Sequence, residues 1–136
     1  MGTSNVALKF VSRINAHDVE GMVSLMSRDH VFIDSLGNRF VRPEIEEGWR
    51  QYFTTVPDYG IAIESKLRNG KLVVIFGTAS GTYVSEGGTL KAENRWATPA
   101  AWRAVISRGK VSEWRIYADN EPIRAKMREE KPKEAG

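Results

Sequence analysis

The sequence predicts an α+β fold in which a strongly curved, mostly antiparallel sheet wraps around N-terminal helices. Two helical patterns open the chain, and four long segments with the alternating pattern of β-strands follow in its second half. Turn signals such as Asn69-Gly70 join these segments, which indicates hairpins and therefore antiparallel pairing. Because the strands alternate apolar and polar residues, one face of the sheet needs a cover, which the helices can supply.

Spacing of apolar residues predicts both N-terminal helices. Between Val6 and Ile14, apolar side chains recur three and four residues apart and form one helical face. A second, shorter helix begins near Asp18, whose carboxylate can cap its first turn, and it buries the apolar residues between Val19 and Met26. Two helices therefore precede the first strand.

The pattern then changes to that of a short hairpin followed by a third helix. Residues 30–34 form a β-type run, a turn surrounds Gly37, and residues 39–41 return as a second strand. Pro43 suits the first turn of a helix that places Ile45, Trp49, Tyr52 and Phe53 on one face, and Pro57 ends it. This helix carries the densest group of aromatic residues in the chain.

The second half of the chain is predicted to form four strands. They comprise residues 59–68, 71–84 and 90–107 and a last strand that stops before Pro122. Pro99 lies inside the third of them and is expected to interrupt the ladder with a bulge that bends the sheet. A bent sheet on helices encloses a conical cavity, and aromatic residues are expected to form its wall.

Length and composition indicate one domain and exclude several kinds of site. The 136 residues are expected to fold as a single domain over residues 1–127, with a charged, flexible tail over residues 128–136. The absence of cysteine excludes disulfides and thiolate metal sites, and His17 and His30 are too few for a histidine metal site. We therefore predict no metal and no cofactor.

Charge and hydropathy predict a soluble cytoplasmic protein. The start of the chain lacks a leader pattern, and no apolar run approaches the length that spans a bilayer, so no membrane association is expected. The net charge is +3, but the basic residues are scattered among acidic ones. Nucleic-acid binding is therefore the least favoured hypothesis, and it predicts salt-sensitive retention on DNA or RNA.

The last strand carries the residues that first suggest chemistry. It places Trp114, Tyr117 and Asp119 before Pro122. A carboxyl group among aromatic rings loses water, which raises its pKa and lets it exchange protons near neutral pH. The alternative is that Asp119 caps the helix that follows, because Asn120 and Pro122 come directly after it. We keep both interpretations.

Three segments give the chain a resemblance to a known family. NAHDVEGM over residues 15–22, HVFIDSLG over 30–37 and GKVSEWRIYAD over 109–119 resemble the nuclear transport factor 2-like superfamily, and within it the SnoaL-like group. The resemblance extends from about Ala7 to Met127 and implies a cystatin-like cone with an internal pocket. The superfamily includes ketosteroid isomerases, polyketide cyclases, limonene epoxide hydrolases, dehydratases and non-catalytic binding proteins, so it implies a fold more closely than a function.

The resemblance implies two catalytic carboxylates, Asp34 and Asp119. Asp34 matches the proton-shuttling aspartate of the ketosteroid isomerases, and Asp119 matches the general acid/base of the polyketide cyclases. If the two approach each other, repulsion separates their titrations and leaves one proton donor and one acceptor. For Asp34 the alternative is a structural role, because an aspartate before a turn often binds the turn amides.

Two specific family mechanisms lack their residues in this chain. The oxyanion-hole positions of the isomerases correspond to Phe10 and to Ala101 or Trp102. Neither Phe nor Ala can donate a hydrogen bond to an enolate, and the indole N–H of Trp has a different reach. The Arg-x-Asp motif of the epoxide hydrolases corresponds to residues 76–80, FGTAS. Both reactions are therefore disfavoured.

These observations predict a protein with a hydrophobic pocket for a small apolar or aromatic molecule. The first hypothesis is a cofactor-independent acid/base enzyme of the isomerase, cyclase or dehydratase type that acts on a cyclic or polyketide-like substrate. The alternative is a non-catalytic binding domain. A homodimer is expected through the outer sheet face, with Val73, Ile75, Arg103 and Val105. The predicted ligand-binding residues are Phe10, Phe32, Trp49, Tyr52, Phe53, Asn94, Trp96, Trp102 and Tyr117.

Overall fold

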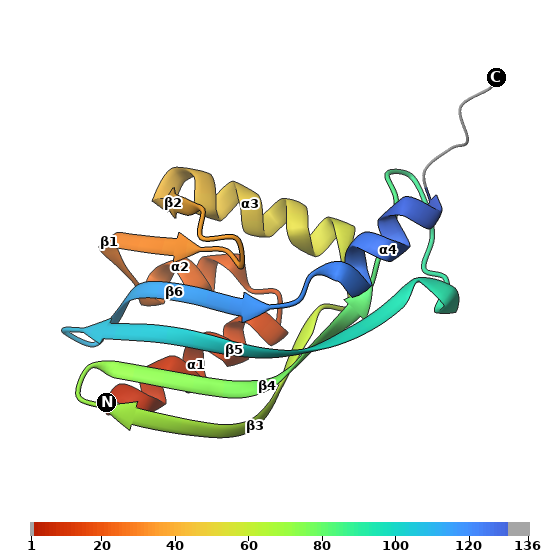
Figure 1. Ribbon diagram of the computed structural model, residues 1–136. Helices are drawn as coiled ribbons and strands as arrows, with labels where there is room; N and C mark the ends of the chain where they lie inside the picture. The colour runs from red at the N-terminus through yellow and green to blue at the C-terminus, as the bar shows by residue number, and fades with distance from the viewer. Residues whose placement is uncertain (1, 131–136) are drawn as a thin grey trace.

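The computed structural model describes residues 2–130 and has the predicted α+β architecture (Figure 1). The helices and strands follow in the order α1 (Thr3–Asn15), α2 (Val19–Leu25), β1 (Met26–Ile33), β2 (Arg39–Val41), α3 (Arg42–Thr55), β3 (Gly60–Asn69), β4 (Leu72–Thr82), the short 3-10 helix η1 (Ala92–Asn94), β5 (Arg95–Ser107), β6 (Lys110–Ala118) and α4 (Glu121–Glu130).

All six strands form one sheet in the order β2-β1-β6-β5-β4-β3. Every neighbouring pair is antiparallel except β1 and β6, which run parallel. The sheet is therefore mostly antiparallel, as the turns predict. Its last strand in sequence, β6, lies in the middle, where it joins the β1–β2 hairpin to the β3–β4–β5 meander.

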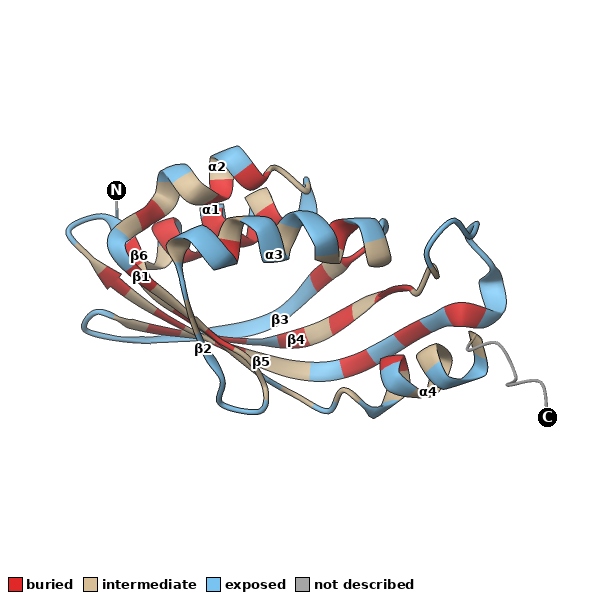
Figure 2. Ribbon diagram, turned by 90° about the horizontal axis from the view of Figure 1, so that it is seen from above, coloured by how far each residue is buried: buried red, intermediate tan, exposed pale blue. Residues whose placement is uncertain are grey.

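Helices α1, α2 and α3 cover one face of the sheet, and the hydrophobic core lies between these helices and that face (Figure 2). The apolar face predicted for α1 is buried, and Phe10 and Ile14 are wholly inaccessible to solvent. Asp18 caps α2 as predicted, because its Oδ1 accepts a hydrogen bond from the Gly21 amide at 2.9 Å. Apolar burial therefore holds α1 and α2 against the sheet, and Asp18 caps the start of α2.

Helix α3 begins one residue before Pro43, which lies in its first turn. Ile45 and Phe53 are buried on its inner face. The helix ends where the Val56 amide donates to the Tyr52 carbonyl at 2.8 Å, directly before Pro57. Proline therefore limits the helix at both ends, because it fits the first turn but cannot continue a helix.

The sheet bends at a close approach between β3 and β4. The register between these strands shifts between Ile63 and Ser65, opposite Gly77. A Cβ atom at Gly77 would lie 1.9 Å from the Ala62 carbonyl oxygen, so only glycine fits there. The bulge and the glycine together let the two strands approach closely while they curve.

Two predictions about β5 are wrong. The strand begins at Arg95 rather than at residue 90, because η1 precedes it. Pro99 makes no bulge: it pairs with Thr78 within an uninterrupted β4–β5 register. The pairing of β5 with β6 extends only as far as Ala100, which lies opposite Ala118. Pro99 lies just beyond this pair, so its missing N–H costs no hydrogen bond to β6.

Two of the four residues expected on the outer face of the sheet, Val73 and Ile75, lie on its inner face, whereas Arg103 and Val105 lie on the outer face, opposite Val74 and Leu72. Val73 and Ile75 are fully buried on the helix side, whereas Phe76 is 40% exposed on the outer side. Successive strand residues point to opposite faces, so the outer face takes the even-numbered residues of this part of β4. Arg103 and Val105 are half-buried on β5, and Arg103 forms an ion pair with Glu113 of β6.

Helix α4 packs against β5 at the end of the described chain. Ile123 is buried, and the Asn94 side-chain amide donates to Glu130 Oε1 at 2.5 Å. Residues 128–130, expected in the tail, are therefore helical, and the rest of the predicted tail lies outside the described residues. Within residues 2–130, no helix is long and apolar enough to cross a membrane, and no cluster of potential metal ligands occurs.

Candidate functional site

A cavity of about 440 Å³ lies between α3 and the inner face of the sheet. Its volume falls in the usual range for small-molecule sites, roughly 300–1,000 Å³. Elements from most of the chain contribute its wall, which is largely aromatic and aliphatic. The lining residues are Phe32, Asp34, Ser35, Phe40, Glu44, Ile45, Gly48, Trp49, Tyr52, Tyr59, Trp102, Trp114, Ile116 and Asn120.

Aromatic contacts between α3 and the β1–β2 hairpin form one wall of the cavity. The ring of Phe32 meets Trp49 edge-on at 5.8 Å between centroids and Phe40 at 6.1 Å. Trp49 meets Tyr52 at 6.3 Å, nearly perpendicular. Two of these three contacts are edge-to-face, a geometry that aromatic pairs prefer, and the rings pack into a continuous wall.

Two phenols, Tyr52 and Tyr59, add polar groups to the cavity. Their rings meet edge-on at 5.1 Å, and Tyr59 is only 5% exposed. Burial raises the pKa of both hydroxyls well above the usual value for tyrosine, because the phenolate would lose its hydration. Both groups therefore remain protonated and can donate hydrogen bonds.

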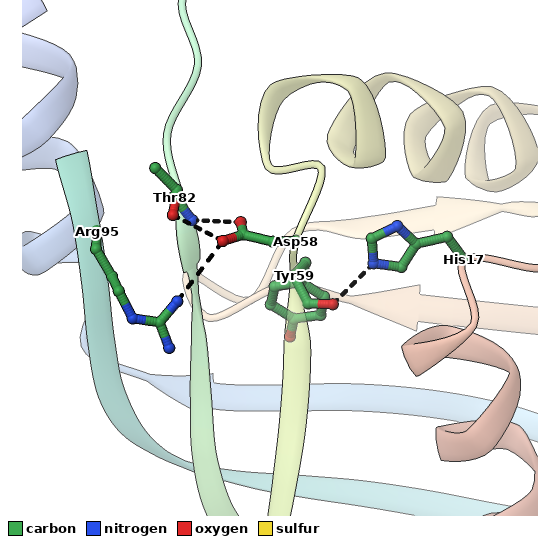
Figure 3. A network of polar contacts seen from close by, with 5 residues as sticks. All are labelled: His17, Asp58, Tyr59, Thr82 and Arg95. Carbon is green, nitrogen blue, oxygen red and sulfur yellow. Dashed lines mark hydrogen bonds and ion pairs between the residues drawn. The ribbon is translucent and has the colours of Figure 1, made fainter. Parts of the chain in front are cut away.

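A network of polar contacts fixes the backbone on either side of Tyr59 (Figure 3). His17 Nε2 donates to the Tyr59 carbonyl at 2.7 Å, while the His17 ring stacks on Phe53 at 4.2 Å. The Asp58 carboxylate accepts from the Thr82 amide and hydroxyl at 2.6 and 2.7 Å. Arg95 lies 3.6 Å from the same carboxylate. Tyr59 is thus held by His17 of the α1–α2 connection, and its neighbour Asp58 is held by β4 and β5.

Asp34 lines the cavity, but its carboxylate also organises the β1–β2 turn. Its Oδ1 accepts from the amides of Leu36 and Asn38, both at 2.9 Å, and its Oδ2 accepts from the Asn38 side chain at 3.1 Å. Nearby, the Asn120 side-chain amide donates to the Ser35 hydroxyl at 2.5 Å. The three donors fix the orientation of Asp34, and Oδ2 retains capacity for another donor.

Helix α3 contributes an acidic, solvent-exposed edge to the cavity. Glu44 and Gly48 lie one turn apart on α3, both exposed and both among the lining residues. Among residues 2–130, Asp34 and Glu44 are the only charged residues of the lining, and no lysine, arginine or histidine of this range belongs to it. The cavity is therefore negative in a protein whose net charge is +3.

Of the eleven predicted site residues, five line the cavity: Asp34, Phe32, Trp49, Tyr52 and Trp102. Four others are buried elsewhere. Phe10 packs on Trp114 at 4.9 Å, Phe53 stacks on His17, Asn94 binds Glu130, and Trp96 lies beside Tyr59 at 6.3 Å.

Asp119 and Tyr117 lie outside the cavity lining and are exposed. Asp119 Oδ1 accepts from the Glu121 amide at 2.9 Å, so this carboxylate binds the first amide of α4. Tyr117 is 47% exposed, with the Arg115 guanidinium 4.7 Å from its ring centre. The structure therefore does not bring Asp119 together with Asp34 as an acid/base pair in the cavity.

Strand parity explains this arrangement. Trp114, Ile116 and Asn120 line the cavity, so even-numbered residues of this segment face inward. Tyr117 and Asp119 have the opposite parity and face outward. The same rule could have identified Ile116 as a lining residue from the sequence. Phe40 and Tyr59 carry no comparable signal, because they lie on a three-residue strand and directly before β3.

His30 is buried near the cavity but does not line it. It is 1% exposed, its Nδ1 donates to the Val111 carbonyl at 2.6 Å, and its Nε2 has no partner. Loss of hydration lowers the pKa of His30 below its usual value. The side chain therefore stays neutral and serves the core rather than the site.

Solved structures share this fold at low sequence identity. A protein assigned to the SnoaL-like polyketide cyclases, from Shewanella denitrificans OS-217, is 18% identical, with a TM-score of 0.80 over 94% of this chain and 98% of that one. AclR from Streptomyces galilaeus is 17% identical, with a TM-score of 0.78 over 93% and 96%.

A third similar structure contains a bound amine. It is a protein of ketosteroid isomerase-like fold from Catenulispora acidiphila DSM 44928, in complex with trimethylamine. It is 14% identical, with a TM-score of 0.75 over 89% of this chain and 90% of that one. At these identities the likeness shows the fold.

Sequence comparison identifies the family. No curated protein matches the chain. A model of the SnoaL-like domain matches residues 7–114, most of the chain. With its α+β fold and its cavity enclosed by a curved sheet, this protein belongs to the SnoaL-like domain family.

Proposed function

We propose that this protein binds a small, largely apolar, ring-containing molecule in the cavity beneath α3. The observation that carries the proposal is the cavity itself: about 440 Å³, with Phe32, Trp49, Trp102 and other apolar residues as walls. Aromatic walls suit a flat or cyclic ligand, because ring stacking and edge contacts add to the burial of apolar area.

The polar groups of the cavity restrict the ligand further. Tyr52 and Tyr59 offer hydrogen-bond donors, which suit a carbonyl or hydroxyl oxygen. Asp34 and Glu44 supply negative charge with no lysine, arginine or histidine among the lining residues of the described chain. An anionic ligand would meet repulsion there, so the proposed ligand is neutral or carries an amine.

Binding can be tested by fluorescence titration with N-phenyl-1-naphthylamine, a neutral multi-ring probe. We expect saturable binding by the native protein and weaker binding by Trp49→Ala, which removes part of the aromatic wall. Tyr117→Ala is the matched control, because it removes an aromatic ring from the outer sheet face. Absence of saturable binding, or equal loss in both variants, would contradict the proposal. Mass spectrometry of molecules that copurify with the protein then addresses the natural ligand.

A second candidate function is proton transfer by Asp34, in the manner of an isomerase, cyclase or dehydratase. It is favoured by a carboxylate on the cavity wall whose Oδ2 retains acceptor capacity. In an isomerisation, Asp34 would take a proton from a carbon beside a carbonyl and return it at another carbon. A phenol of Tyr52 or Tyr59 would stabilise the enolate oxygen by donating to it.

Proton transfer can be tested without knowing the substrate. Deuterium exchange at the acidic carbon positions of 2-tetralone, a neutral bicyclic ketone, can be followed by NMR in D2O. If Asp34 is the base, Asp34→Asn should lower the protein-catalysed exchange rate by about 100-fold. Asp119→Asn, the exposed matched control, should leave it unchanged. Exchange no faster than in buffer, or equal rates in native protein and Asp34→Asn, would reject this role and leave binding alone.

A further inference from the structure

Gly48 occupies an unusual place for a glycine. It lies in the middle of α3, is exposed to solvent, and lines the cavity one turn after Glu44. Glycine weakens a helix interior, because the unfolded chain loses more conformational freedom there than with alanine. An exposed mid-helix position would ordinarily be filled more favourably by a residue with a side chain.

Neither backbone nor packing requires glycine at this position. Gly48 is not among the glycines with positive φ, which are Gly37, Gly70, Gly87 and Gly109. A Cβ built at Gly48 would meet no atom within 4 Å, whereas one at Gly81 would lie 2.2 Å from Val56. The space beside Gly48 is therefore open, and Gly48 itself is one of the residues that line the cavity.

We propose that Gly48 is a specificity-determining residue that keeps the edge of the cavity open along α3. A ligand whose ring system lies among the aromatic walls would extend a substituent outward over Gly48. This inference rests on the proposed binding function and adds the shape of the ligand: a ring body with a projecting group, rather than a compact molecule that the cavity encloses.

The neighbouring charges specify the chemistry of that projecting group. It would pass the Glu44 carboxylate one turn earlier on α3, and Asp34 is the other charged residue of the lining. No lysine, arginine or histidine of the lining, as far as the structure describes the chain, offsets them. The group is therefore uncharged or bears an amine, because a carboxylate or phosphate would be repelled.

The test compares a compact probe with an extended one. Indole represents the ring body alone, and N-phenyl-1-naphthylamine represents a ring body with a projecting group. We expect Gly48→Leu to raise the Kd of the extended probe about ten-fold while the Kd of indole changes by no more than about two-fold. Gln51→Leu is the matched control, because Gln51 is exposed on α3 and does not line this cavity; it should alter neither Kd.

Thermal melting accompanies the titrations. Gly48→Ala should raise Tm, because no atom obstructs its Cβ and alanine favours the helix. If Gly48→Leu does not fold, Gly48→Ala and Gly48→Val replace it and should weaken the extended probe progressively. Equal affinities for that probe in native protein and folded variants, or equal losses for both probes, would overturn the role of Gly48. Failure of the native protein to bind either probe would instead overturn the proposed function.

Discussion

Among single residues, His30 has the clearest consequence for stability. Its ring is buried with Nε2 unpartnered, and burial lowers its pKa from the usual value near 6.5. Arg42 acts in the same direction, whereas the hydrogen bond to Val111 and the charges of Asp29 and Glu113 oppose the shift. The unfolded chain therefore takes up a proton at a higher pH than the native protein.

The sign of the pH dependence follows from this difference. Stability contributed by neutral His30 is complete above about pH 6.5 and is lost as the pH falls toward the lowered pKa of the native protein. We predict that the free energy of unfolding, measured in urea, falls between pH 7.5 and 5.5. His30→Gln should reduce this slope. An identical slope in His30→Gln would contradict the assignment.

Asp34 stabilises the β1–β2 turn, and this structural role can be measured separately from any role in the cavity. Its Oδ1 is the acceptor for the Leu36 and Asn38 amides. We predict that Asp34→Ala lowers the free energy of unfolding, measured in urea, by about 1–2 kcal/mol, because both turn amides lose their acceptor. Asp34→Asn keeps an acceptor oxygen and should cost less. If the two variants are equally stable, the turn does not depend on this side chain.

At the scale of single elements, period-two alternation predicted much of the sheet and part of the site. It indicated β3 to β6 and placed Trp102 inward, and residue periodicity on α3 indicated Trp49 and Tyr52. The same period, applied to β6, separates Trp114 from Tyr117. Phe40 and Tyr59 could not be found this way, because their positions depend on contacts between segments distant in sequence.

Strand β4 offers a prediction about curvature. A Cβ at Gly77 would collide with the Ala62 backbone oxygen, whereas a Cβ at Gly48 of α3 meets nothing. We predict that Gly77→Ala destabilises the protein by about 1–3 kcal/mol, because backbone must move. Gly48→Ala should stabilise it by about 0.5–1 kcal/mol. Urea unfolding gives the free energy of unfolding of both variants. If Gly77→Ala is as stable as the native protein, the two strands can move apart without a cost in free energy.

At the scale of the whole molecule, the outer sheet face is open in the described chain. Phe76, Ala101 and Tyr117 form one registered row across β4, β5 and β6, and Phe76 and Tyr117 are substantially exposed. We propose that a second copy of the chain covers this face, because a row of apolar and aromatic residues across central strands suits a symmetric interface.

The proposed dimer can be examined by light scattering after size-exclusion chromatography. Phe76→Asp should shift the native protein from a dimer toward a monomer, since it would bury an unpaired charge at the interface. Leu90→Asp, at an exposed position in the loop before η1, is the control for a general effect of added charge. A native protein that is monomeric at all accessible concentrations would exclude the dimer.

The central position of β6 has a consequence for synthesis of the chain. The β1–β2 hairpin and the β3–β4–β5 meander have no strand pairing with each other except through β6, which pairs with β1 and β5. On the ribosome, residues 1–109 would emerge as two sheet fragments with their central edges unpaired. The nascent chain can close the cavity only after Trp114, Ile116 and Asn120 have been added. A chain that ends before residue 110 would thus contain two sheet fragments with unpaired, aggregation-prone edges rather than one complete sheet.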